Sequence, residues 1–283
     1  MAKQIKSPSL INYNYCTIKI TRSRLEYGLL AIPTSILNLF PKESNELLIY
    51  FDGSKILSKK SFVISEKNRE ARVYGLSEWY KKNKLVEDDE IVIQLLDRKD
   101  NVYGFITEKK FIDVNNKIQK KFDESSNGKK AESNLISLSE WNKTDLEQAA
   151  LRELYRLSKE ETQERKQRQR KNTKSKDAVP PQLRITLDQI YRGVCQVCEF
   201  WFLKKDMRPY FEIHHLDVSL GNHPKNLIIV CANCHRQFEF ADVEKEYNDD
   251  GWLVEVFFNQ NSFLVNQAIL ELNAKDFIKT TYS

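Results

Sequence analysis

The 283-residue sequence predicts an α+β protein with two domains. Between residues 15 and 113, short segments alternate apolar and polar residues, a pattern typical of a β-rich domain. Further along, Cys195–Glu239 holds four of the five cysteines and all four histidines, so side chains able to bind metal are concentrated in one stretch. We therefore expect domains at residues 1–122 and 181–283, joined by a helical, basic linker at residues 123–180.

Composition limits the classes of protein to which this chain can belong. A hydrophobic content of 41% is enough to build two cores, and a charged content of 30% is typical of a water-soluble protein. The first residues lack the apolar core of a signal peptide, and no apolar run reaches the roughly 18 residues that a membrane span requires. We therefore expect no membrane association and a location in the reducing cytoplasm.

The N-terminal domain is expected to contain several short strands separated by Gly, Asn or Asp. The strands are predicted at Tyr15–Ile20, Leu47–Phe51, Lys60–Ile64, Arg72–Tyr74, Glu90–Leu96 and Val102–Thr107. Two short helices are predicted between them, at Pro33–Leu39 and Leu76–Lys82.

One segment of this domain is specific enough to compare with a family. Gly75–Leu85 combines a helix bearing two aromatic residues with an Asn-x-Leu turn, and Glu87–Glu90 then leads into the strand Ile91–Ile93. This order resembles the DNA-binding pseudobarrel of plant B-three-type transcription factors, a fold that also occurs in restriction endonucleases. Asp88–Asp89 stands where that family has Gly-Asp, and the rest of the match is mostly hydrophobic spacing.

The resemblance implies that two loop arms grip the major groove of double-stranded DNA. The matching regions are Thr21–Tyr27 and Ser65–Arg72, which mix the side chains that read base edges or hold phosphates. The candidate DNA-binding residues are Arg22, Arg24, Lys67, Asn68, Arg69 and Arg72.

The linker is expected to begin with a flexible break and to continue as a helix. Ser125–Gly128 indicates the break within residues 123–133, and apolar residues at helical spacing follow from Ser139 to Leu157. We expect this helix to continue into the basic run at residues 159–176. That run is interpreted either as a segment that tracks the DNA backbone or as a solvated spacer helix.

Four cysteines form two Cys-x2-Cys pairs, Cys195 with Cys198 and Cys231 with Cys234. Four thiolates suit a tetrahedral Zn²⁺ ion and leave no open position, so this site is expected to stabilise the fold without taking part in chemistry. Two disulfides or four buried free thiols are the alternatives. The fifth cysteine, Cys16, is expected to be a buried apolar residue.

The histidines lie between and just after these pairs. Tyr210–Leu216 alternates like a strand, Gly221–Pro224 indicates a turn, and Leu227–Val230 is a second short apolar run. Cys231–Glu239 is typical of a knuckle that leads into a helix. Hydrolysis of a phosphodiester needs an activated water and a divalent ion, which a metal site and one imidazole can supply. Neighbouring strand residues face opposite ways, so one of the two adjacent histidines should bind the ion and the other should act on water.

The combined pattern resembles the HNH endonucleases, the ββα-metal nucleases, in the version built into a four-cysteine zinc site. The resemblance covers roughly residues 190 to 245. It implies that His214 and His235 are metal ligands, that His215 is the general base, and that Asn226 orients it. Glu239 occupies the position of a third ligand, where many relatives carry histidine. A carboxylate there favours Mg²⁺ or Mn²⁺ as the catalytic ion. Glu212 and Asp217 flank the histidines as surface charges or as partners of the ligands.

The two resemblances together predict a site-specific DNA endonuclease of the restriction type. Because one HNH site cuts one strand, we expect a homodimer on double-stranded DNA. One alternative is a restriction enzyme that depends on methylated or hydroxymethylated cytosine. Another is a catalytically inactive, zinc-containing DNA-binding protein, which would explain the cysteines but not the histidines.

Overall fold

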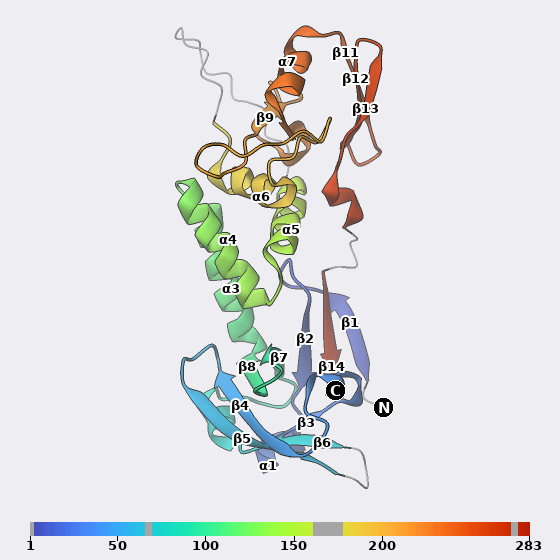
Figure 1. Ribbon diagram of the computed structural model, residues 1–283. Coiled ribbons are helices and arrows are strands. Elements are labelled where there is room, and N and C mark those ends of the chain that lie inside the picture. The colour runs from blue at the N-terminus through green and yellow to red at the C-terminus, as the bar shows by residue number, and fades with distance from the viewer. Residues whose placement is uncertain (1–2, 66–69, 161–177, 273–276) are drawn as a thin grey trace. The chain divides into compact units, whose positions relative to one another are not determined.

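The computed structural model describes residues 3–65, 70–160, 178–272 and 277–283 (Figure 1). The chain forms two compact units. The first unit comprises residues 1–117 and 275–283, and the second comprises residues 118–274. Helix α3 (Glu108–Asp123) runs from the first unit into the second. Both units are mixed α and β, as the sequence predicts.

The first unit is built on one sheet of nine strands with the order β1-β14-β2-β7-β8-β4-β5-β6-β3. The strands are β1 (Gln4–Pro8), β2 (Tyr15–Lys19), β3 (Leu29–Ile32), β4 (Asn45–Phe51), β5 (Leu57–Ile64), β6 (Ala71–Tyr74), β7 (Glu90–Asp97), β8 (Val102–Thr107) and β14 (Ile278–Tyr282). The neighbours β14 and β2 are parallel, as are β4 and β8, and the other neighbours are antiparallel.

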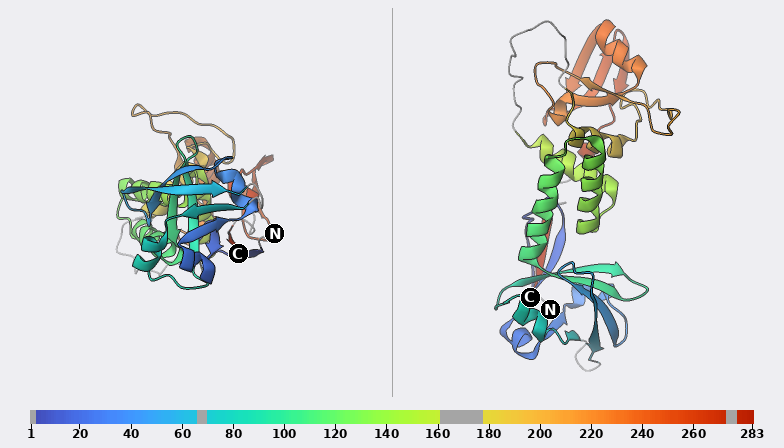
Figure 2. Two further views of the ribbon diagram at one scale, coloured as in Figure 1. Left: turned by 90° about the horizontal axis from the view of Figure 1, so that it is seen from below. Right: turned by 90° about the vertical axis from the view of Figure 1, so that its left-hand side faces the viewer.

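The sheet curls around an apolar core. Leu30 of the edge strand β3 belongs to the same core as Ile18 of β2 and Tyr282 of β14, which stand near the opposite end of the strand order. Figure 2 shows the twisted strands from two further directions. Three short helical segments accompany the sheet: α1 (Arg22–Tyr27), the 3-10 helix η1 (Thr34–Leu39) and α2 (Ser77–Lys82). Trp79 and Tyr80 of α2 enter the core, so apolar burial fixes this helix.

The six strands predicted in this region are present, with ends that shift by up to three residues. Strands β1, β3 and β14, each four or five residues long, were not predicted. The expected loop arm at Thr21–Tyr27 is mostly helical, since α1 occupies it. The prediction that Cys16 is buried is wrong: Cys16 is exposed on β2, whose neighbours Tyr15 and Thr17 point inward.

The last strand changes the domain boundaries expected from the sequence. Residues 181–283 were expected to form one domain, but β14 pairs with β1 and β2 of the first unit. Lys279 of β14 is almost buried, and its Nζ lies 2.8 Å from Glu90 Oε2 and 2.7 Å from Glu108 Oε1. Two carboxylates therefore pair with one nearly buried ammonium and hold β14 in register.

The expected linker is also part of a folded unit. Helices α4 (Gly128–Asn142), α5 (Leu146–Ser158) and α6 (Pro181–Tyr191) pack together through buried residues such as Leu135 and Leu154. The break predicted at Ser125–Gly128 is present as a short connection, because α3 ends at Asp123 and α4 begins at Gly128. This connection is ordered, since Asn127 Oδ1 accepts a hydrogen bond from Lys130 N. The single helix predicted after it is two helices, separated at Lys143 with a φ of 54°. The basic run continues into residues 161–177, which lie outside the described residues.

The rest of the second unit holds the cysteines and histidines. Its elements are β9 (Glu212–His215), the 3-10 helix η2 (Pro224–Asn226), β10 (Leu227–Val230), α7 (Ala232–Phe240), β11 (Val243–Tyr247), β12 (Leu253–Phe258), β13 (Asn261–Leu264) and the 3-10 helix η3 (Ala268–Glu271). The hairpin β9–β10 followed by α7 is the predicted strand, strand and helix order. Strands β11, β12 and β13 form a separate antiparallel sheet (Figure 1). In the described part of the chain, no helix combines the length and apolarity needed to cross a membrane.

Candidate functional site

Four cysteine side chains converge in the core of the second unit. The Sγ atoms of Cys195, Cys198, Cys231 and Cys234 all lie within 4.8 Å of one another, and those of Cys198 and Cys231 are 3.6 Å apart. All four are free thiols. The structure thus contains no disulfide among these four cysteines and places four sulfur atoms around one point. This donor set fits a tetrahedral Zn²⁺ ion.

Backbone turns aim these thiols. Glu199 has a φ of 60° and its N–H donates to Cys195 O at 3.0 Å, which closes the turn around the first pair. The second pair lies at the start of α7, where Cys231 Sγ accepts a hydrogen bond from Cys234 N at 3.4 Å. A hydrogen bond from the Cys234 thiol lowers the pKa of Cys195 to about 4. Cys195 therefore favours the thiolate form that a metal ion requires, whereas the same cluster raises the pKa of Cys198 mainly through burial and that of Cys234 mainly through its hydrogen bond with Cys195.

The histidines of the ββα segment border a pocket of about 620 Å³. The pocket lies between the hairpin β9–β10, helix α7 and strand β11. Its lining residues are Ile213, His214, His215, Leu216, Asp217, Val218, Gly221, His235, Phe238, Glu239, Val243, Lys245 and Tyr247. The structure therefore brings together the four side chains to which the sequence assigned a metal or a proton-transfer role, along with Lys245 and Tyr247 of β11.

His214 and His235 form the centre of this pocket. Their ring centroids are 5.1 Å apart with the planes nearly perpendicular, and His214 also stacks on Phe238 at 4.3 Å. The packing of Phe238 limits the rotation of His214. The two imidazoles, one from β9 and one from α7, are close enough to share an ion after small side-chain rotations.

Carboxylates lie on both sides of His235. The Nδ1 atom contacts Glu212 Oε2, and the Nε2 atom lies 3.7 Å from Glu239 Oε1. The Tyr210 hydroxyl donates to Glu212, and this hydrogen bond lowers the pKa of the Glu212 carboxyl. Glu212 thus fixes the Nδ1–H tautomer and leaves Nε2 available as a ligand. Glu212 is a partner of the predicted ligand and not only a surface charge.

His215 has a different set of contacts. Its Nε2 atom lies 2.9 Å from Asn222 Oδ1, and the Asn222 amide nitrogen donates to Ala178 O at 3.3 Å. This orientation of the Asn222 amide makes Nε2 the protonated nitrogen of His215. The Nδ1 atom then carries the lone pair and can accept a proton.

Asn226 is buried and binds the loop that follows β9. Its amide nitrogen donates to Asp217 O at 2.7 Å and Gly221 O at 2.8 Å, while its Oδ1 accepts from Asp217 N at 2.8 Å. These bonds hold the backbone on which Asn222 stands. Asn226 therefore acts on His215 through Asn222, one step further away than the sequence suggested. Nothing in the spacing of the motif distinguished Asn222 as the direct partner.

Glu239 differs from the cysteines in having competing partners. Its Oε2 atom accepts a hydrogen bond from Arg236 at 2.5 Å, and its side chain is 29% exposed. Among the described residues, the four cysteines are the group of metal-binding side chains whose ligand atoms all lie within 4.8 Å of one another. The histidines and Glu239 do not form such a group. In the histidine pocket, the predicted metal ligands line one cavity, but their ligand atoms do not meet this distance criterion.

The predicted DNA-binding residues of the first unit lie in three environments. Arg22 is 81% exposed and pairs with Glu26, and Arg72 on β6 pairs with Glu70 at 2.5 Å. Arg24 turns inward and donates to Lys19 O, and burial lowers the pKa of its guanidinium. Lys67, Asn68 and Arg69 lie outside the described residues. Of the described candidates, Arg22 and Arg72 are therefore the ones placed to meet a ligand.

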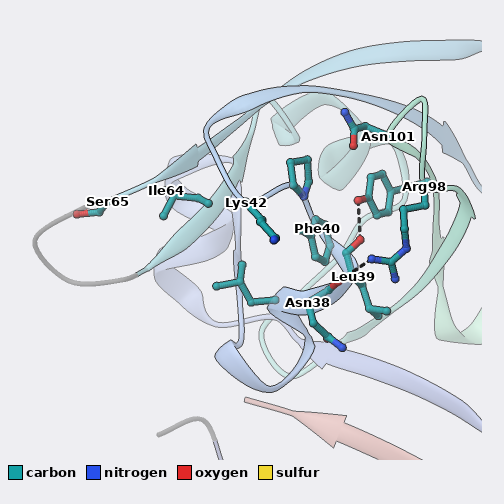
Figure 3. Close-up of a pocket in the computed structure, with 11 residues that line it drawn as sticks. Asn38, Leu39, Phe40, Lys42, Ile64, Ser65, Arg98 and Asn101 are labelled. Atoms are coloured by element: carbon teal, nitrogen blue, oxygen red, sulfur yellow. Dashed lines mark hydrogen bonds between the residues drawn. The ribbon is translucent and has the colours of Figure 1, made fainter.

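A second pocket of about 620 Å³ lies in the first unit (Figure 3). Two hydrogen bonds fix its wall: Tyr103 donates to Leu39 O at 2.8 Å, and Arg98 donates to Asn38 O at 3.1 Å. Ser65, at the start of the second predicted arm, also borders this pocket.

No protein-family model matches this chain, and no curated protein sequence matches it. Several solved structures resemble part of it. An Arabidopsis FUS3–DNA complex has a TM-score of 0.28 and 12% identity, covering 32% of this chain and 92% of that chain. The N-terminal domain of Helicobacter pylori LlaJI.R1 has a TM-score of 0.26 and 18% identity, covering 32% and 76%. An Arabidopsis thaliana LEC2–DNA complex has a TM-score of 0.27 and 17% identity, covering 38% and 96%.

Proposed function

We propose that the protein is a metal-dependent DNA endonuclease of the HNH type, with its active site in the histidine pocket of the second unit. The observation that carries this proposal is the pocket itself. It gathers His214, His215, His235 and Glu239 beside a four-cysteine cluster, on a hairpin followed by a helix. A structural zinc site alone would not require these four side chains to share a pocket.

The residues present fit a divalent ion. His214 and His235 would bind it through imidazole nitrogen. Glu239 would supply a carboxylate oxygen, and this ligand is the one that favours Mg²⁺ or Mn²⁺. Bound there, such an ion would neutralise charge on the scissile phosphate. Glu212 keeps His235 in the ligand tautomer, since it occupies Nδ1.

His215 is the residue that would activate water. Its Nε2 atom is engaged by Asn222, so Nδ1 is the atom that takes the proton from the attacking water. Lys245 lines the same pocket, and its Nζ donates to Leu216 O at 2.6 Å. An ammonium at this position can also contact a phosphate oxygen, which favours an anionic substrate.

We further propose that the first unit recognises the DNA sequence and that two copies of the chain cut the two strands. Arg22 and Arg72 offer exposed guanidinium groups for base edges or phosphates. One histidine pocket per chain accounts for one cut strand, so a double-strand break requires a second copy. Sedimentation that shows only monomers during concerted double-strand cleavage would contradict the homodimer.

The decisive experiment is digestion of genomic and plasmid DNA with Mg²⁺ or Mn²⁺, followed by sequencing of the ends. The wild-type protein should cut at defined sites, and the variant His215→Ala should bind the same DNA without cutting it. Plain, methylated and hydroxymethylated substrates should be compared, because a requirement for modified cytosine would identify a modification-dependent enzyme. DNA left intact with both ions and all three substrates would contradict the nuclease proposal and favour an inactive zinc-containing DNA-binding protein.

A further inference from the structure

The loop that follows the first cysteine pair, Cys195 and Cys198, has exposed aromatic side chains. We name residues Phe200–Arg208 the aromatic loop. Phe200 is 55% exposed, Trp201 53%, Phe202 43% and Met207 73%. The rings of Phe200 and Phe202 are neighbours, with centroids 5.9 Å apart. Several large apolar side chains exposed within one short loop indicate a contact surface, because single proteins rarely expose large apolar patches to water.

The aromatic loop is held in one shape. Lys204 N donates to Arg208 O at 2.8 Å, and Leu203 forms a bridge with Pro209, which together close a small hairpin. Cys195 N donates to Phe200 O at 3.0 Å and so joins the loop to the cysteine cluster. A surface that is already ordered loses less conformational entropy when it binds a partner.

A glycine permits this close anchoring. Gly193 has a φ of 76°, and a Cβ atom added there would lie 2.4 Å from Pro209 Cβ. A larger residue at this position would strain the backbone and push the end of the loop away. The close contact between Gly193 and Pro209 therefore helps to set the direction of the aromatic loop.

Charge on the loop identifies the class of partner. Lys204, Lys205 and Arg208 are all exposed beside the rings, while Asp206 turns toward Lys204, with 3.6 Å between Nζ and Oδ2. Protein interfaces are depleted in lysine at their cores, whereas surfaces that bind single-stranded nucleic acid combine aromatic rings with cations. This combination favours a nucleic acid over a second copy of the chain.

The loop is connected to the histidine pocket through side chains. Phe202 stacks on Tyr210 at 4.9 Å with an interplanar angle of 20°, and Tyr210 hydrogen-bonds to Glu212, which contacts His235. DNA held by the loop would therefore lie beside the residues that hold the ion.

We propose that the aromatic loop is a nucleic-acid contact in which Phe200 and Trp201 stack on unpaired or unstacked bases and the neighbouring cations hold phosphates. This inference rests on the proposed function, because it assigns a DNA-contacting surface to the second unit. It predicts tighter binding to DNA that contains a single-stranded gap than to intact duplex, since stacking needs an accessible base face.

The test uses the full chain with His215→Ala, so that DNA is bound but not cut. Titration with gapped duplex should quench the fluorescence of Trp201, because a stacked base quenches indole emission. Adding Trp201→Ala should weaken binding to gapped DNA by about tenfold, equivalent to ~1.4 kcal/mol, and should abolish most of the quenching. The pair Lys204→Ala and Lys205→Ala should weaken binding and lower its salt dependence.

Phe240→Ala is the matched control, because Phe240 is 80% exposed in the same unit and lies outside the loop. It should leave affinity and quenching unchanged. Equal affinity of the Trp201→Ala variant and its parent for gapped DNA would overturn the inference, as would a change confined to self-association in sedimentation. Cleavage by the chain with wild-type His215 is measured separately. If the protein cleaves DNA normally but Trp201→Ala changes neither affinity nor quenching, the aromatic-loop proposal is rejected and the nuclease proposal stands. If gapped DNA quenches Trp201 but the protein does not cleave, the nuclease proposal is rejected and the aromatic-loop proposal stands.

Discussion

The cysteine cluster and the histidine pocket lie in the same unit but are organised differently. The four thiols already lie within 4.8 Å of one another, and three of the four are buried. In the histidine pocket, His214 and His235 have centroids 5.1 Å apart and Glu239 is shared with Arg236. The four converged cysteines leave no room for a substrate, whereas the histidine pocket, with a volume of about 620 Å³, has room for one. The cysteine cluster is therefore suited to stabilise the fold, and the histidine pocket is suited to accept a ligand.

The largest effect is expected from Cys231→Ser. Loss of one buried thiolate should release the zinc ion and lower the free energy of unfolding by about 3 kcal/mol or more, because binding of a structural ion contributes directly to folding. Metal analysis and thermal denaturation measure both quantities. Cys16→Ser is the matched control, since Cys16 is exposed in the other unit, and it should change neither. A Cys231→Ser protein that keeps its zinc and its melting temperature would remove the distinction between the two sites.

His215→Ala should have the largest effect on chemistry with almost none on stability. Loss of the proton acceptor should slow cleavage by about 10²- to 10⁴-fold while zinc content and DNA affinity stay unchanged. His223→Ala serves as control, because His223 contacts Glu160 O and does not line the pocket. Single-turnover cleavage gives the rate. Retained strand scission in His215→Ala would reject its role as general base.

Asn226→Ala tests whether the pocket depends on its supporting loop. The change removes three hydrogen bonds to the backbone of Asp217 and Gly221 from a buried position, and should cost ~1–3 kcal/mol of stability. Cleavage should also fall, because the loop that carries Asn222 would move. Asn222→Ala should lower cleavage with a smaller loss of stability. Equal loss of stability in both variants, measured by denaturant unfolding, would contradict this division of roles.

Glu239→Gln should have the smallest effect. A neutral amide is a weaker ligand for Mg²⁺ than a carboxylate, so about tenfold more Mg²⁺ should be needed for half-maximal cleavage. Titration of the metal at fixed DNA concentration measures this shift. Arg236→Gln is the informative partner variant, because it removes the guanidinium that competes for Glu239 and should shift the requirement the opposite way. An unchanged metal dependence in both would remove Glu239 from the site.

The two sites were not equally visible in the sequence. Cys195, Cys198, Cys231 and Cys234 could be grouped because Cys-x2-Cys spacing alone aims two thiols at one point. The pocket's main residues were also predicted, because a strand and a following helix carry them in a fixed order. The partner of His215 could not be predicted, since Asn222 reaches it through a loop whose shape depends on the buried amide of Asn226.

The fold shows the same contrast between local and distant determinants. Strands such as β7 and β8 were predicted because their alternation is local, but β14 pairs with β2 across more than 250 residues and its five-residue pattern is uninformative alone. Arg24 was predicted to bind DNA because it is a basic residue within the first expected arm. Its inward turn depends on the carbonyl of Lys19, which no residue pattern reveals.

The place of β14 in the sheet has a consequence for biosynthesis. The ribosome synthesises residues 118–274 before it synthesises β14. During that time the first unit lacks one strand, and Glu90 and Glu108 lack the ammonium of Lys279. Strands β1 and β2 have no shared neighbour until then. We therefore expect the first unit to mature only after translation of the second, and a nascent chain stalled before β14 to have an incomplete sheet with exposed edges.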